Sequence, residues 1–238
     1  MHPPSQKPLD TSPRKLQSFE FGSPLWWRKS GIWIVCIFAV VAFLMMNAPR
    51  TTGWSKRPDQ TEAVSNARQI GLALSEFDQE YGKYPGETTI AKVREKTGSG
   101  LDLGTKSSND FFRQLLAADI VQGELMFYAK IRGTKQPDDV FRGKDALKKG
   151  EVGFAYLSGL SSAGDPTRPI AVTPLIPGTD RFDPKPFDGR AVILKMDNSV
   201  TVMHINKDGH VMEGRRNLLD PGHPIWGGEK WTLVWPDL

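Results

Sequence analysis

The sequence has little cysteine, little net charge, and none of the short motifs that mark several common enzyme classes. Its single cysteine, Cys36, excludes an intramolecular disulfide, so a compact domain must be held together by its core. A P-loop and a dinucleotide-binding fingerprint are absent. The segment from Gly159 to Gly164 reads GLSSAG, which lacks the G-x-S-x-G spacing of a nucleophile elbow. We therefore predict that the protein is not an enzyme.

The small positive charge of the chain is concentrated at its beginning. Of the formal net charge of +4, the first 30 residues carry +3, from Lys7, Arg14, Lys15, Arg28 and Lys29 against Asp10 and Glu20. The rest of the chain is nearly neutral, so a pI near 9.1 does not indicate a nucleic-acid-binding face. Four prolines within the first 23 residues, with little apolar periodicity, predict a disordered basic head over residues 1–30.

One long apolar run divides the chain. The sixteen residues from Gly31 to Met46 (GIWIVCIFAVVAFLMM) contain no charged residue, and the stretch reaches eighteen residues when it is extended to Ala48. A largely apolar stretch of eighteen residues is long enough to cross a bilayer, and Trp26, Trp27 and Trp33 lie where indole rings favour the membrane interface. We predict a transmembrane helix over residues 31–48, a linker over residues 49–58 and one domain over residues 59–238.

Two alternatives to a membrane span are a buried core helix and a cleaved secretory signal. Arg28, Lys29 and Arg50 flank the run and argue against a buried helix. Thirty mostly polar residues precede the run, which is too long for the n-region of a signal peptide. The positive-inside rule then places the head in the cytoplasm and the domain in a periplasm, although Lys56 and Arg57 make the charge asymmetry small. The predicted location is a bacterial inner membrane, with a single span.

The clearest helix of the domain follows the linker. Apolar residues recur at spacings of 4, 3, 4, 3 and 4, which places them in one stripe on a helix: Ala63, Ala67, Ile70, Leu74, Phe77 and Tyr81. Asp59 and Glu62 form a D-x-x-E capping signature, while Gly82 and Pro85 predict the end of the helix. We expect the stripe to pack on a sheet of the same domain or to contact other subunits. A coiled-coil seam is the alternative for a run of under three heptads.

The remaining elements predict an α+β fold with an antiparallel sheet. Ser108 is the expected N-cap of a second helix that ends near Gly123, with Phe112, Leu115, Leu116 and Ile120 in the core. No element is predicted over residues 124–150, and residues 174–189 are expected to form an irregular loop. Turn residues around Asn198 and Gly209 predict a meander of three strands near the C-terminus. The predicted strands span residues 152–157, 170–173, 191–196, 200–206, 210–213 and 231–235.

Three groups of side chains could hold a ligand. Asp180, Asp183 and Asp188 lie within one loop and supply the oxygen ligands that calcium prefers, although their spacing does not match an EF-hand and turn-forming aspartates are the simpler interpretation. His204 and His210 could share a zinc ion across adjacent strands, as a metal-dependent envelope enzyme would require, but no Cys or H-E-x-x-H pattern accompanies them. Tryptophans could form a sugar or partner platform or could seal a sheet edge: Trp226, Trp231 and Trp235. We therefore expect no cofactor, and calcium is the one ion that we keep as a hypothesis.

Two phrases give the chain a resemblance to a known family. The segment AVSNARQIGLALSEFDQEYGKYP, from Ala63 to Pro85, and the turn NKDGHV, from Asn206 to Val211, resemble type II secretion major pseudopilins and type IV prepilin-like proteins. The resemblance implies a pilin-like helix laid across an antiparallel sheet, assembly through the membrane helix into a short periplasmic fibre, and calcium bound in C-terminal loops. The prepilin peptidase motif is missing, because Cys36 stands where that motif has a glutamate after Gly31.

This resemblance implies a function. The expected protein is a membrane-anchored pseudopilin-like structural subunit of a type II secretion or pilus-like apparatus, which contacts the membrane and copies of itself or other pilin-like subunits. No nucleic acid is expected as a partner. The alternative is a monomeric, membrane-anchored periplasmic domain that binds a glycan or calcium.

Overall fold

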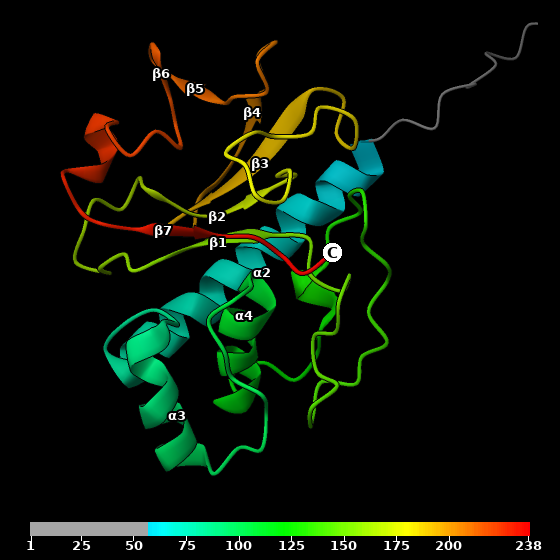
Figure 1. Cartoon of the computed structure of the whole chain (residues 1–238), viewed down its shortest axis with the longest axis vertical. Helices are drawn as coiled ribbons and strands as arrows, with labels where there is room; N and C mark the ends of the chain where they lie inside the picture. Colours follow the sequence, from blue (N-terminus) through cyan, green and yellow to red (C-terminus); the bar gives the residue numbers. More distant parts are fainter. Residues whose placement is uncertain (1–56) are drawn as a thin grey trace, which may run out of the picture. The chain divides into compact units, whose positions relative to one another are not determined.

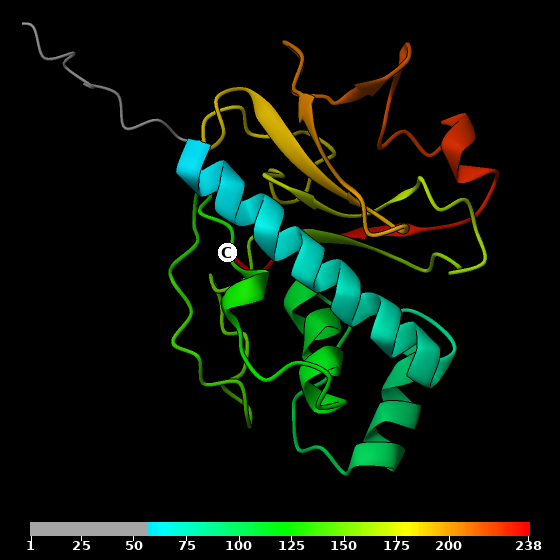
Figure 2. The same ribbon diagram turned by 180° about the vertical axis from the view of Figure 1, so that it is seen from behind.

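The computed structural model describes residues 57–238. The predicted head and transmembrane helix, and residues 49–56 of the predicted linker, lie outside the described residues. Within residues 57–238, no helix is both long enough and apolar enough to cross a membrane. This part of the chain has an α+β fold, as predicted, with a five-stranded antiparallel sheet on one side of a long helix and shorter helices on the other (Figures 1 and 2).

The long helix is α2, which spans Arg57–Tyr81 and passes diagonally across the molecule (Figure 2). It begins two residues before the predicted cap, Asp59, because Pro58 fits the first turn, where no N–H donor is needed. It ends as predicted at Tyr81: Gly82 has a φ of +77°, and its N–H donates to the Asp78 carbonyl at 2.7 Å. All six residues of the apolar stripe are buried in the core of this domain.

The sheet has the strand order β4-β3-β2-β1-β7, with every neighbouring pair antiparallel. Consecutive strands form a meander, and the C-terminal strand returns to pair with β1 at the opposite edge (Figure 1). Helix α2 lies against β3 and β4, where Gly71 leaves room for the Asn198 and Leu194 side chains. The strands are β1 (Ala155–Ser158), β2 (Pro169–Thr173), β3 (Arg190–Lys195), β4 (Val200–His204) and β7 (Thr232–Val234).

The predicted third strand of the C-terminal meander does not join this sheet. Its residues contain β5 (Met212–Glu213), which pairs with β6 (Arg216–Asn217) in a separate two-stranded sheet. A tight turn at Gly214, which has a φ of +63°, brings β6 back onto β5 in place of β4. An isolated antiparallel bridge between Ile205 and Val211 is found where the predicted third strand would have paired with β4.

The other helices differ from expectation at their ends. Helix α4 (Ser108–Ala117) has Ser107 as its N-cap, in a capping box with Asp110, so the predicted cap Ser108 is the first helical residue. It ends six residues before Gly123 because Asp119 takes a φ of +58°. Helix α3 (Ile90–Thr97) was not expected, since Val93 is its one buried residue. Three short 3-10 helices complete the described fold: η1 (Glu87–Thr89), η2 (Leu125–Phe127) and η3 (Pro224–Trp226).

An aromatic cluster joins α4, η2 and β1. The Phe112 ring lies 5.0 Å from the Phe127 ring and 5.5 Å from the Tyr156 ring, measured between centroids. The buried Tyr156 hydroxyl donates to the Pro85 carbonyl at 2.9 Å, just beyond the end of α2. Burial raises the pKa of Tyr156 far above its ordinary value, so this hydroxyl stays protonated. The cluster therefore fixes the helices and β1 relative to one another.

Candidate functional site

The three aspartates of the predicted calcium loop are not brought together. Asp180 accepts a hydrogen bond from the Asn217 amide at 3.0 Å, and Asp183 accepts from the backbone N–H of Lys185 at 2.9 Å. Asp188 has a φ of +51° in the turn that leads into β3. Within residues 57–238, these three carboxylates do not form a group whose oxygens lie within 4.8 Å of one another. The loop therefore does not bring the three predicted ligands together in this structure.

The histidines singled out in the sequence do not form a metal site with each other among the described residues, and the tryptophans have local partners. His204 is exposed at the end of β4, whereas His210 lies 3.6 Å from the Asp180 carboxylate. Trp226 is fully buried, its ring centroid lies 4.5 Å from that of Trp231, and its indole N–H donates to the Asp220 carbonyl. The Trp235 indole N–H donates to the Thr179 carbonyl at 2.8 Å. These contacts favour a sealing role for the tryptophans over an exposed flat platform.

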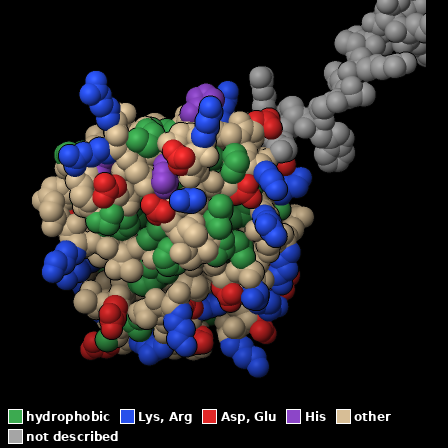
Figure 3. Space-filling view, turned by 45° about the horizontal axis from the view of Figure 1, so that its top comes forward, with side chains coloured by type: hydrophobic (Ala, Val, Ile, Leu, Met, Phe, Trp, Pro, Cys, Tyr) green, Lys and Arg blue, Asp and Glu red, His purple; other side chains and the backbone are tan. Residues whose placement is uncertain are grey.

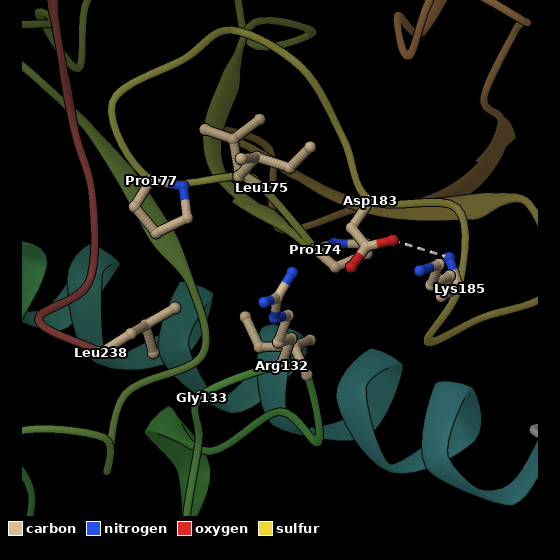
Figure 4. A pocket seen from close by; sticks show the side chains of 10 residues that line it. Arg132, Gly133, Pro174, Leu175, Pro177, Asp183, Lys185 and Leu238 are labelled. Atoms are coloured by element: carbon tan, nitrogen blue, oxygen red, sulfur yellow. Dashed lines mark hydrogen bonds between the residues drawn. The ribbon is translucent and has the colours of Figure 1, made fainter.

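A hollow of about 530 Å³ lies beside the 174–189 loop. Pro174, Leu175, Pro177 and the C-terminal Leu238 form its apolar wall. Arg132 points into the hollow between Leu238 and Asp183 (Figure 4). The hollow therefore combines an apolar surface with the charged side chains of Arg132, Asp183 and Lys185, which suits a small ligand that carries polar groups.

A group of carboxylates lies in the segment between α4 and β1. Glu124 and Glu151 are fully buried, Asp138 is exposed, and one carboxylate oxygen from each lies within 4.8 Å of the others. Glu124 Oε1 accepts from the backbone N–H of Leu147 at 2.5 Å, and Glu151 Oε2 accepts from that of Lys148 at 2.6 Å. Glu124 Oε2 and Glu151 Oε1 are buried without a hydrogen-bond partner.

Side chains of α4 position the two backbone donors. Asn109 donates to the carbonyls of Leu147 and Lys148, at 3.0 and 3.1 Å. Arg113 donates from Nε to the Ala146 carbonyl at 2.7 Å and from Nη2 to the Leu147 carbonyl at 3.0 Å. Leu147 has a φ of +49°, which is rare for a residue with a branched side chain and shows how firmly this turn is held. The N–H groups of Leu147 and Lys148 therefore point at the buried glutamates.

The local electrostatics follow from this burial. Burial raises the pKa of Glu124, and the like charges of Glu151, Asp138 and Asp139 raise it further, against the opposing effect of the Leu147 N–H. At the exposed side, the Lys148 ammonium lies 2.8 Å from Asp138 and holds the pKa of that carboxyl below its ordinary value. Oxygen ligands of this kind suit a hard cation rather than zinc or copper.

Reasoning from the sequence did not find these three residues. Glu124, Asp138 and Glu151 are separated by more than a dozen positions, match no metal-binding motif, and fall in or beside the segment for which no element was predicted. The fold brings them together through the turn that Asn109 and Arg113 hold. Glycine directly before each glutamate, at 123 and 150, is the one local feature they share.

Comparison with known proteins gives no match: no family model, no curated protein and no solved structure is significantly similar to this chain. The resemblance to pseudopilins therefore stays a prediction.

Proposed function

We propose that this protein is a membrane-anchored, pseudopilin-like structural subunit of a bacterial type II secretion or pilus-like apparatus. The observation that carries the proposal is the arrangement of α2. This helix begins eleven residues after Met46, where the apolar run ends, and it packs on β3 and β4 of an antiparallel meander. An apolar N-terminal segment that leads into one long helix on such a sheet is the order of parts that the family resemblance implies.

The buried stripe changes where subunits could meet. Its six side chains are taken up by the domain's own core, so they are not available to another subunit. The outer face of α2 is mostly polar: Arg68 and Glu76 are exposed on either side of Leu72, whose side chain is 62% exposed. In this proposal, subunits associate chiefly through residues 31–48 in the membrane, and the domains make smaller contacts outside it.

Surface charge supports a structural role at a membrane rather than binding to nucleic acid. On the face drawn in Figure 3, basic and acidic side chains are interspersed around a central group of apolar side chains. The sequence gives the same result, because the part of the chain after the head is nearly neutral. The proposed partners are copies of this chain or other pilin-like subunits, in a bacterial inner membrane with the domain in the periplasm.

The single cysteine provides a direct test of the proposed association. Cys36 lies inside the apolar run, so mild oxidation of native membranes should crosslink the full-length chain to itself or to a neighbouring subunit that has a cysteine nearby. Cys36→Ser should abolish the crosslink. In that background, single cysteines at 37, 38 and 39 sample the other faces of the helix, and crosslinking should favour one face. A monomer at all four positions would contradict the proposal.

Anchoring is tested separately. Ala39→Asp places a charge at the centre of the apolar run and should reduce membrane insertion and assembly together. The matched change Ala42→Leu keeps the run apolar and should leave both unchanged. Normal membrane fractionation and normal secretion with Ala39→Asp would count against an anchored subunit.

The hollow beside the 174–189 loop favours a second candidate function, a monomeric anchored domain that binds a small ligand such as a glycan. Its volume of about 530 Å³ and the Arg132 side chain within it are the supporting observations (Figure 4). Binding of the full-length protein to a glycan array, lost in Arg132→Ala and kept in the exposed control Arg215→Ala, would support this function. Absence of binding by the unaltered chain would count against it.

A further inference from the structure

We propose that Glu124, Asp138 and Glu151 form a binding site for a hard divalent cation, Ca²⁺. The bound ion would join the two ends of the segment between η2 and β1. This site is distinct from the 174–189 loop and goes beyond the proposed structural role. It joins three parts of the chain: the residue before η2, the exposed 138–139 turn, and the residue that leads into β1.

One carboxylate oxygen of each buried glutamate has no hydrogen-bond partner. Glu124 and Glu151 are both fully buried, and each uses one carboxylate oxygen to accept a backbone hydrogen bond. The second oxygen of each, Glu124 Oε2 and Glu151 Oε1, is also buried but accepts no hydrogen bond. Buried polar atoms in folded proteins nearly always have a partner, and an unpaired buried carboxylate is especially costly. Lys135 Nζ lies 3.5 Å from Glu151 Oε1, whereas Glu124 Oε2 has no such ion pair. A bound cation would supply a partner for Glu124 Oε2 and a second one for Glu151 Oε1.

Carboxylates outnumber the ammonium groups that are paired with them around this site. Four carboxylates interact here, because Asp139 also accepts the Glu124 N–H at 3.0 Å. Two ammonium groups oppose them: Lys148 is bound to Asp138, and Lys135 lies 3.5 Å from Glu151 Oε1 with its own side chain 56% exposed. If every carboxylate is ionised, two negative charges remain uncompensated, which is the charge that one divalent cation carries.

The ligand chemistry selects the class of cation. All three ligands are carboxylates, and calcium takes oxygen ligands at about 2.3–2.6 Å in a flexible geometry. Two oxygens on opposite sides of one Ca²⁺ would therefore lie about 5 Å apart, and the three observed oxygens lie within 4.8 Å of one another. Because Asp138 is exposed while the glutamates are buried, the ion would enter from the Asp138 side.

A shared proton is the alternative that the test must separate. A single proton between Glu124 and Glu151 would also remove the repulsion of two buried carboxylates. Calcium should stabilise the protein in the first case and should have no effect in the second. The difference is therefore measurable at neutral pH with the full-length chain in detergent.

The experiment compares the melting temperature after EGTA treatment and dialysis with that in added CaCl₂ at pH 7.5. At a calcium concentration about 100-fold above Kd, we expect the melting temperature to rise by about 5–10 °C. Calorimetric titration should give one Ca²⁺ per chain. No rise in melting temperature and no heat of binding would overturn the proposal in favour of the shared proton.

Three variants assign the binding to these residues. Glu124→Gln and Asp138→Asn should each lose most of the calcium-induced rise, and Asp183→Asn in the 174–189 loop should keep it. Without calcium, Glu124→Gln should be at least as stable as the unaltered chain, because it removes one buried negative charge. Should it fail to fold, Asp138→Asn at the exposed position still decides the question. Loss of the rise in Asp183→Asn alone would place the ion in the other loop and contradict this assignment.

Discussion

Helix α2 meets the sheet mainly through apolar side chains, whereas the segment from Glu124 to Glu151 is also held by a network of side-chain hydrogen bonds to its backbone. In the first region, α2 lies against β3 and β4, and its apolar stripe from Ala63 to Tyr81 is buried. In the second region, Asn109 and Arg113 bind the 146–148 carbonyls, and Asn66 donates to the carbonyls of Leu125 and Tyr128. Apart from η2, this segment contains no helix and no strand.

The two regions should respond differently to change. Apolar packing is roughly proportional to buried area, so a truncated side chain costs stability in proportion to the space it leaves. A buried polar network depends on each partner, because removal of one group leaves another unsatisfied. A region held in the second way can carry a binding site, since its polar groups already converge on one point.

The largest effect is expected in the apolar region. Phe77 is fully buried, and its ring stacks on Tyr81 at 4.4 Å between centroids, so Phe77→Ala should lower the free energy of unfolding by about 3–5 kcal/mol. Leu72→Ala on the same helix, where the side chain is 62% exposed, should cost less than about 0.5 kcal/mol. Chemical denaturation of both variants measures the difference. Equal losses would show that the stripe is not the packed face.

The next effect tests the polar region. Asn109 makes hydrogen bonds to the Leu147 and Lys148 carbonyls and to the Asp237 N–H, and its side chain is buried. Asn109→Ala should cost about 2–3 kcal/mol, because three backbone groups lose a hydrogen bond from a buried side chain. The exposed control Gln122→Ala should stay within about 0.5 kcal/mol. A cost for Asn109→Ala as small as that of the control would mean that the network contributes little to stability.

The sequence predicted the apolar region far better than the polar one. The 3-4 spacing of the stripe residues identified α2 and its buried face. Apolar segments separated by turn residues located β1 to β4 and β7 to within a few residues. The separate β5–β6 hairpin was missed, because Met212–Glu213 could pair equally well with either neighbour until the turn at Gly214 decides.

There is a physical reason why the cluster of three carboxylates could not be predicted. Glu124, Asp138 and Glu151 have no periodicity, and charged residues in an irregular segment are normally solvated. The burial of the two glutamates depends on a turn held by Asn109 and Arg113, which lie on a helix whose apolar residues alone were interpreted. Hydrogen bonds from side chains to distant backbone groups leave no local pattern in the sequence. This site could therefore be found only from the structure.

A smaller effect is expected where β1 meets the segment that follows α2. The Tyr156 hydroxyl donates to the Pro85 carbonyl, so Tyr156→Phe should cost about 1–2 kcal/mol by leaving that buried acceptor unpaired. Tyr84→Phe, a half-buried tyrosine with no such hydrogen bond, is the control and should cost less than about 0.5 kcal/mol. Denaturation curves of the two variants give the comparison, and a neutral Tyr156→Phe would remove this bond from the account.

The stability of the calcium-free protein should depend on pH. Because the pKa of Glu124 is raised in the fold, the folded state binds its proton more tightly, and stability should rise as pH falls from neutral toward 4.5. Below about 3.8, stability should fall as Asp138, Asp165 and Asp197, whose pKa values are lowered by hydrogen bonds, take up protons. Melting temperatures across this range should show that Glu124→Gln loses the rise and keeps the fall. A rise that persists in Glu124→Gln would assign it to another group.

Hydrogen exchange of the full-length chain, with calcium and with EGTA, compares the two regions in one measurement. The account predicts that EGTA speeds exchange at the N–H groups of Leu147 and Lys148 by about tenfold or more, because these groups bind the two buried glutamates. Exchange at Ile193 and Leu194 in β3 should not change, since apolar packing protects that strand. Equal exchange at Leu147 and Lys148 in both conditions, or the same change in β3, would contradict the account.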